Sequence, residues 1–247
     1  MKILEKVFVI IDMIKLLFLF LIFMNTEVFS QEKPVSREAF GYAYFEAVSY
    51  INQNRAQISG VFISKNVNPD ILIPVVFPER LRYSGFSNYF ETKSLEFLYT
   101  EFGSESVDFS IGPFQMKPSF AEAVEFEITN RPALREKYSE LKIRETDIVQ
   151  EREERIRRLN LLYFQALYIA AFSDLLNDRF NLSALSQIEN IRFTAAAYNT
   201  GFTKNYAQIS AAGRMHCFPH GANYTGVQYS YTDVSVFYFQ NDYFYSK

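Results

Sequence analysis

The chain has 247 residues, and 49% of them are hydrophobic, so it can bury the core of at least one domain. Its net charge of −3 lacks the basic surface expected of a nucleic-acid-binding protein. Its one cysteine, Cys217, excludes an internal disulfide.

Residues 1–30 have the features of a secretory signal peptide. Lys15 precedes an apolar run over residues 16–24, and residues 28–30 offer a cleavage site ahead of Gln31. The run is shorter than the ~20 residues that span a bilayer. We therefore expect an exported protein of the periplasm or cell envelope, with residues 31–247 as its mature domain. An uncleaved N-terminal anchor is the alternative.

The mature chain is predicted to be mainly helical, because long strand-like alternations are few. Hydrophobic periodicity, caps and breakers predict helices over residues 34–56, 69–79, 91–102, 118–127, 133–180 and from 191 to at least 198. In the second of these, Asn68 is placed to cap the helix and Pro69 to begin it. A loop is expected from Gly213 to Gly226, and residues 231–238 fit either a helix or a strand.

Residues 133–158 form a densely charged section of the longest predicted helix. Both signs alternate at helical spacing, most densely over residues 150–158, which predicts a solvated helix with many ion pairs. Binding of an envelope protein partner through this section is the alternative. Residues 159–176 are strongly apolar and are expected to form a central helix.

Glu79 is the strongest candidate for a catalytic residue. It ends a predicted helix whose residues 71–78 are among the least polar of the mature chain. A carboxylic acid donates a proton near neutral pH only if an apolar setting raises its pKa, which this position favours. Arg80 and Arg82 would oppose that rise if their side chains came close. An ordinary helix-end glutamate paired with an arginine is the alternative.

Glu79 belongs to the first of three short segments that follow one another in a fixed order. The first is NPD at 68–70 with Glu79 following Pro69 by ten positions, the second is GPFQMKP at 112–118, and the third is AAYNTG at 196–201. In order and spacing they resemble the active-site segments of the soluble lytic transglycosylases, which share a fold with goose-type lysozymes. The chain departs from that family at Arg80, where serine is usual, and in residues 133–158, which look like a charged helical insertion.

The resemblance implies a mainly α, lysozyme-like helical domain that cleaves peptidoglycan glycan strands without a cofactor. Glu79 would act first as acid and then as base, and the product would be a 1,6-anhydro-muramic acid. Gln115, Tyr198 and Asn199 would line the substrate site. Their alternatives are a turn cap for Gln115, a buried ring for Tyr198 and a helix end for Asn199.

Two functions other than that of a transglycosylase stay open. Goose-type lysozymes are thought to use additional aspartates to place a water, and Asp108 or Glu91 could supply that second carboxylate, although Asp108 also fits a turn or helix cap. A catalytically inactive glycan-binding or scaffold protein would keep the same fold. His216, Cys217 and His220 lie within five positions, but with no fourth ligand nearby we predict no metal site.

Overall fold

The computed structural model describes residues 34–85 and 89–244. The helices of its first half are α2 (Arg37–Phe40), α3 (Tyr42–Ser64), α4 (Pro69–Gly85), α5 (Tyr89–Phe102), α6 (Pro118–Thr129) and α7 (Pro132–Lys137). The second half contains η1 (Ser139–Leu141), α8 (Ile148–Leu159), α9 (Leu162–Phe180), η2 (Leu182–Ala184), α10 (Gln187–Thr200), α11 (Tyr206–Ala212), β1 (His216–Phe218), β2 (Tyr229–Ser230), α12 (Tyr231–Tyr238) and η3 (Phe239–Tyr243). The mainly helical fold class is confirmed.

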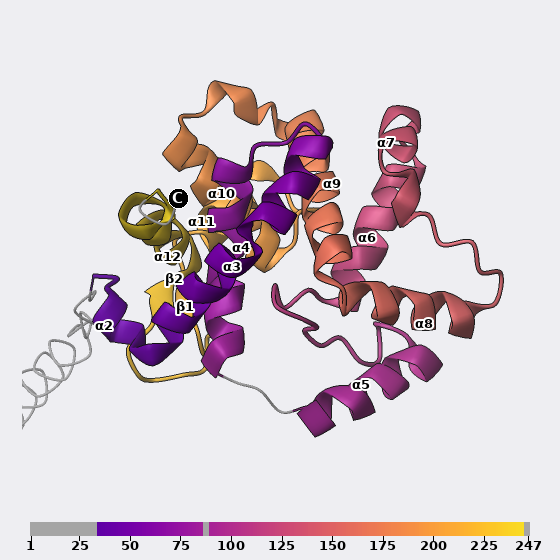
Figure 1. Ribbon diagram of the computed structural model, residues 1–247, viewed down its shortest axis with the longest axis horizontal. Helices are drawn as coiled ribbons and strands as arrows, with labels where there is room; N and C mark the ends of the chain where they lie inside the picture. The colour runs from indigo at the N-terminus through magenta and orange to yellow at the C-terminus, as the bar shows by residue number, and fades with distance from the viewer. Residues whose placement is uncertain (1–33, 86–88, 245–247) are drawn as a thin grey trace, which may run out of the picture. The chain divides into compact units, whose positions relative to one another are not determined.

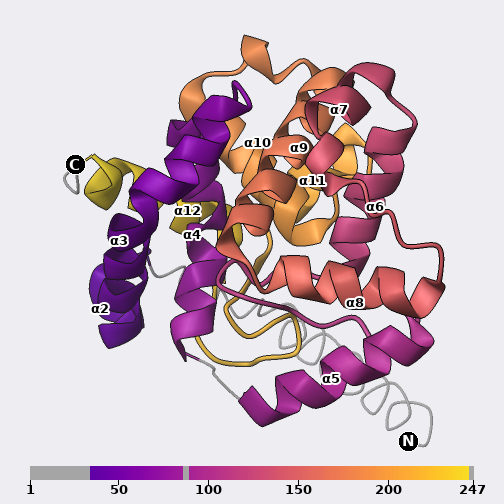
Figure 2. The ribbon, with the colours of Figure 1, turned by 45° about the vertical axis from the view of Figure 1, so that its right-hand side comes forward.

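Helix α9 is the central element that the apolar run at 159–176 predicts. Over residues 165–172 its side chains are buried on all faces, as expected of a helix surrounded by protein. It contacts α3, α6 and α8. In Figures 1 and 2, α5, α6 and α8 lie together on one side of α9, and α3, α4, α10 and α12 lie on the other.

Helix α4 contacts α3, α10 and α12, and it differs from its predicted extent. The sequence predicts an end at Pro78-Glu79, whereas α4 continues to Gly85, so the prediction of a helix-end glutamate was wrong. Pro74 and Pro78 each remove one helical hydrogen bond, but the apolar side chains between them are buried, and this packing outweighs the loss. At the start of α4, the side chain of Asn68 accepts a hydrogen bond from the backbone N–H of Asp70 at 2.9 Å, as predicted.

The predicted helix over residues 133–180 is divided into α7, η1, α8 and α9. The carboxylate of Asp147 starts α8 by accepting from the N–H groups of Val149 and Gln150. A short break then separates α8 from α9. The ion pairs expected of the charged section are present in α8, as between Arg157 and Glu154, but the helix is not solvated on every face, because one face is buried against α5 and α6.

Arg155 shows why this charged helix can be buried. Its side chain is 3% exposed, and its guanidinium binds Glu125 and Glu151 at 2.7 and 2.6 Å. It also donates to the hydroxyl of Tyr99 at 2.7 Å. A buried charge is tolerated when it is paired and hydrogen-bonded in this way, and two of these partners lie on α5 and α6, far away in the sequence.

The remaining differences between the predicted and the observed helices are small. The first predicted helix is broken at Gly41, whose φ is +54°, and α3 extends to Ser64. The helix over 91–102 is confirmed as α5, which ends before Gly103. Residues 231–238 form helix α12, and the preceding loop contains the short β1–β2 pair.

The predicted signal peptide, residues 1–30, lies outside the described residues. Within residues 34–85 and 89–244, no single helix is both long and apolar enough to cross a membrane. Helices α8 and α9 meet the length and hydropathy requirement only as a pair, and they are bent by 97° relative to each other.

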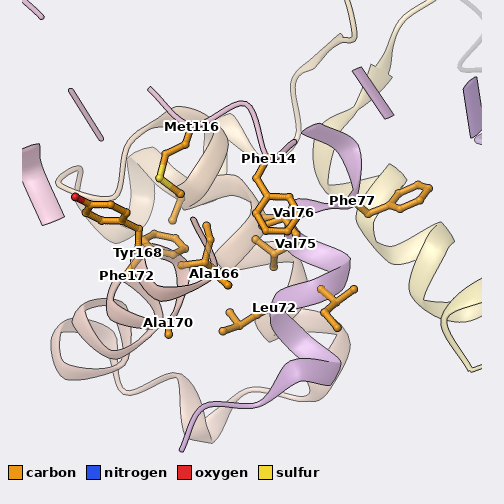
Figure 3. Close-up of a cluster of buried hydrophobic side chains, with 14 of the residues drawn as sticks. Leu72, Val75, Val76, Phe77, Phe114, Met116, Ala166, Tyr168, Ala170 and Phe172 are labelled. Carbon is orange, nitrogen blue, oxygen red and sulfur yellow. The ribbon is translucent and has the colours of Figure 1, made fainter. Parts of the chain in front are cut away.

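One cluster of buried side chains connects α4, the segment around Phe114 and α9 (Figure 3). Val75 and Val76 of α4 and Phe114 are fully buried. Ala166 and Phe172 carry the cluster along α9. This core places the segment at 112–118 beside the helix that bears Glu79.

Candidate active site

Glu79 lies in the second half of α4 and is 5% exposed. Nη1 of Arg82, one turn later on the same helix, donates to both carboxylate oxygens at 3.0 and 3.2 Å. Burial raises the pKa of Glu79 to about 7, although the charges of Arg82 and Lys117 oppose the rise. The carboxyl group can therefore hold or release a proton near neutral pH, as a general acid and base must.

The segment at 112–118 forms a tight turn. Ile111 and Met116 exchange both backbone hydrogen bonds, at 2.9 and 3.0 Å, and the N–H of Gln115 donates to the carbonyl of Gly112. Both Gly112 and Gln115 have positive φ values, +67° and +47°. Glycine is required at 112 for a second reason, because a Cβ there would lie 2.4 Å from Nε2 of Gln165.

The side chain of Gln165, on α9, holds this turn in place by hydrogen bonds. Its side chain is fully buried, and its oxygen accepts from the N–H of Phe114 at 2.9 Å. Its Nε2 donates to the carbonyls of Ile111 and Leu159, both at 2.7 Å. The sequence analysis missed Gln165, and the available signal was a single amide in a long apolar run.

Tyr198 of α10 lies between the turn and Glu79. Its hydroxyl donates to the carbonyl of Phe114 at 2.8 Å. Helix α10 packs against α4, which bears Glu79. Burial raises the pKa of the Tyr198 hydroxyl far above its usual range, and the negative charge of Glu79 adds to the rise. Segments one, two and three therefore meet around Glu79. The hydroxyl of Tyr198 supports the turn rather than the carboxylate.

Tyr231, at the start of α12, is a further residue that the sequence analysis missed. Its hydroxyl donates to the carbonyl of Val75 at 3.1 Å, one turn before Glu79. Burial raises its pKa far above the usual range, and the charges of Glu79 and Tyr198 add to that effect. The partly buried ring of Tyr198 and the buried ring of Tyr231 thus add neutral groups to the surroundings of the acid.

Asp108 and Lys117 lie beside this group. Nζ of Lys117 pairs with the carboxylate of Asp108 at 3.2 Å, and its charge lowers the pKa of Glu79. Asp108 also accepts from the N–H and hydroxyl of Ser119 at 3.2 and 2.8 Å, in the first turn of α6. Its contacts are those of a helix cap, and a single ion pair links it to the surroundings of Glu79.

The other predicted residues are less closely involved. The side chain of Gln115 donates to the carbonyl of Gly112 at 2.9 Å, as in the turn-cap alternative. Asn199 is exposed near the end of α10. Glu91 belongs to α5, but its side chain lies outside the part of the chain that the structure describes. Arg80 points toward α3, with its guanidinium over the rings of Tyr50 and Tyr83.

The residues that could ligate a metal lie mainly in and after β1. His216 and Cys217 belong to this strand, and the ring of His220 lies against that of Tyr224, tilted by 43°, in the following loop. Within the described ranges, no group of three or more histidine, cysteine or acidic side chains is arranged so that it could hold a metal ion. The predicted chemistry at Glu79 requires no bound cofactor.

No known protein family, curated protein or solved structure matches the chain.

Proposed function

We propose that the protein is a lytic transglycosylase that cleaves the β-1,4 bond between N-acetylmuramic acid and N-acetylglucosamine in peptidoglycan. The main support is the position of Glu79, a nearly buried carboxylate with a pKa of about 7. Two further segments of the family pattern lie beside it, in the family's order, through Tyr198 and the turn at Phe114. The signal-like residues 1–30 support export to the periplasm or cell envelope.

In this mechanism, protonated Glu79 donates its proton to the glycosidic oxygen as the bond from that oxygen to C1 breaks. The electron pair of the bond leaves with the oxygen, and the acetamido group of the muramic acid stabilises the cation at C1. The 6-hydroxyl of the same sugar then attacks C1 and loses its proton to the Glu79 carboxylate. One carboxyl group near its pKa serves both steps.

The proposal is tested by mass spectrometry of peptidoglycan treated with the full chain. We expect products that end in 1,6-anhydro-muramic acid, which are one water lighter than hydrolysis products. Reducing-end sugars would instead identify a hydrolase of the goose-lysozyme kind and direct attention to Asp108.

Two substitutions separate catalysis from folding. Glu79→Gln should abolish cleavage while leaving the circular dichroism spectrum unchanged. Glu96→Gln is the matched control, because Glu96 is another buried glutamate paired with a cation, Lys93, and lies on α5. Cleavage that survives Glu79→Gln would show that another residue is the acid.

A scaffold or partner-binding protein is the second candidate, and one surface favours it. A cavity of about 760 Å³ lies between α5, α6, η1 and α8. Phe102, Phe126 and Ile148 line it and are 62%, 67% and 54% exposed. Exposed apolar groups of this size often mark interaction sites. A folded protein that binds peptidoglycan or an envelope protein without cleaving glycan would support this alternative.

A further inference from the structure

The ion pair between Arg82 and Glu79 is more buried than a pair on a helix surface usually is. Residues three apart face the same side of a helix, and an exposed ion pair at this spacing stabilises the helix only weakly. Here the carboxylate side chain is 6% exposed and the arginine side chain 28% exposed. One nitrogen of Arg82 contacts both oxygens of Glu79, so it restricts the carboxylate to one orientation.

The guanidinium of Arg82 also lies against Phe218, the last residue of β1. Its carbon lies 5.1 Å from the centre of the Phe218 ring. Nε of Arg82 is buried and lacks a hydrogen-bond partner among the described residues. A buried N–H without a partner destabilises the folded state. Arg82 keeps its contact with Glu79 despite this cost, which is typical of a functional constraint.

Four groups face Glu79 from the elements packed around it. Arg82 lies on α4 and Lys117 follows the turn, and both carry positive charge. Tyr198 of α10 and Tyr231 of α12 are neutral because burial raises their pKa values. Arg82 is the stronger of the two charges that oppose burial, and Lys117 is the weaker.

We propose that Arg82 is a positioning residue for Glu79, which fixes the orientation of the carboxylate and allows one buried group to act as acid and then as base. This inference rests on the proposed function. Without a nearby cation, burial would keep Glu79 protonated, and it would be a poor acceptor for the proton of the attacking 6-hydroxyl. Arg82 balances the two forms, so that a second carboxylate is not needed in this mechanism.

The pH dependence of cleavage tests this role. Glu79 must be protonated for the first step, so the rate should fall as pH rises through about 7. In Arg82→Gln, this alkaline limb should move to higher pH, and the maximal rate should fall. Well above the midpoint, each pH unit of movement changes the protonated fraction about tenfold.

Two further variants separate the charge of Arg82 from its shape and from other effects. Arg82→Lys keeps the positive charge, so the alkaline limb should stay near its wild-type position, and it also serves if Arg82→Gln does not fold. Arg80→Gln is the matched control, since Arg80 lies on the same helix but stacks on Tyr50 and Tyr83. It should leave the profile unchanged. An alkaline limb that stays in place in Arg82→Gln would overturn the inference.

A measurement without substrate distinguishes the failure of this inference from failure of the proposed function. The carboxyl group of Glu79 is titrated by NMR in the full chain labelled with ¹³C-glutamate, and its resonance is identified by its loss in Glu79→Gln. We expect a higher midpoint in Arg82→Gln than in the wild type. If the enzyme cleaves glycan and the midpoint does not move, the role of Arg82 is refuted. If no form cleaves glycan, the proposed function is refuted, and the role of Arg82 in catalysis with it.

Discussion

The burial of Glu79 should make the protein less stable as pH rises, and replacing it should remove that dependence. The pKa of Glu79 is raised from 4.5 to about 7. The folded state therefore binds the proton more tightly than the unfolded chain does, and the free energy of unfolding falls as pH rises between these two values. Each pH unit in this window costs about 1.4 kcal/mol, so the total is about 3 kcal/mol.

Glu79→Gln is the change that measures this cost. Glutamine does not titrate, so relative to the wild type the variant should gain about 3 kcal/mol between pH 4.5 and 7 and nothing further above pH 7. In a chain of this length that corresponds to a change in Tm on the order of 10 °C. The other titratable groups contribute equally to the free energy of unfolding of both proteins, so their contributions cancel in the difference.

Urea denaturation of both proteins at pH 5, 6, 7 and 8 provides the test. Asn199→Ala, which removes an exposed neutral side chain, is the control, and its stability should run parallel to that of the wild type at every pH. Parallel curves for Glu79→Gln and wild type would refute the reasoning, because they would mean that the carboxyl group has the same pKa in the folded and unfolded chain.

Further substitutions test the turn that supports the site. Gly112→Ala should lower the free energy of unfolding by about 2–3 kcal/mol, because the residue has a positive φ and a Cβ there would meet Gln165. Gly60→Ala is the matched control: Gly60 lies on α3 with open space around it, so the substitution should raise the free energy of unfolding by about 0.5–1 kcal/mol. Gln165→Leu removes three buried hydrogen bonds to the backbone and should cost about 3 kcal/mol. Tyr198→Phe should cost about 1–2 kcal/mol by removing the bond to Phe114. Chemical denaturation measures all of these, and a Gln165→Leu variant as stable as the wild type would contradict the role assigned to the amide.

That the three segments lie together was an expectation from their resemblance to the lytic transglycosylases, and the contact between Tyr198 and Phe114 agrees with it. The sequence analysis did not predict that Arg82 contacts Glu79, because it ended helix α4 too early. Ending the helix at Glu79 removes the expectation that residue 82 lies on the same face. A helix that continues to Gly85 predicts the pair directly from its spacing of three.

Other features depend on contacts that a single sequence does not reveal. Tyr231 reaches Val75 across 156 positions, and no local pattern specifies that hydrogen bond. The charged helix α8 has a composition typical of a solvated helix, and only its partners on α5 and α6 explain why Arg155 is buried. Gln165 is an intermediate case, because an amide within an apolar helix requires buried partners even where their identity is unknown.

The position of the acid on α4 also has an energetic reason. An ionised carboxylate at this depth costs about 3 kcal/mol relative to the unfolded chain, and a loop with few buried contacts could not offset that cost. On α4, Val75, Val76 and Phe77 precede Glu79 and are fully buried. Each such side chain contributes about 1.5–3 kcal/mol, so two of them outweigh the penalty. A carboxyl group that titrates near neutral pH therefore belongs on a helix packed as tightly as α4, and substitutions that loosen this packing should lower the pKa of Glu79 by admitting water.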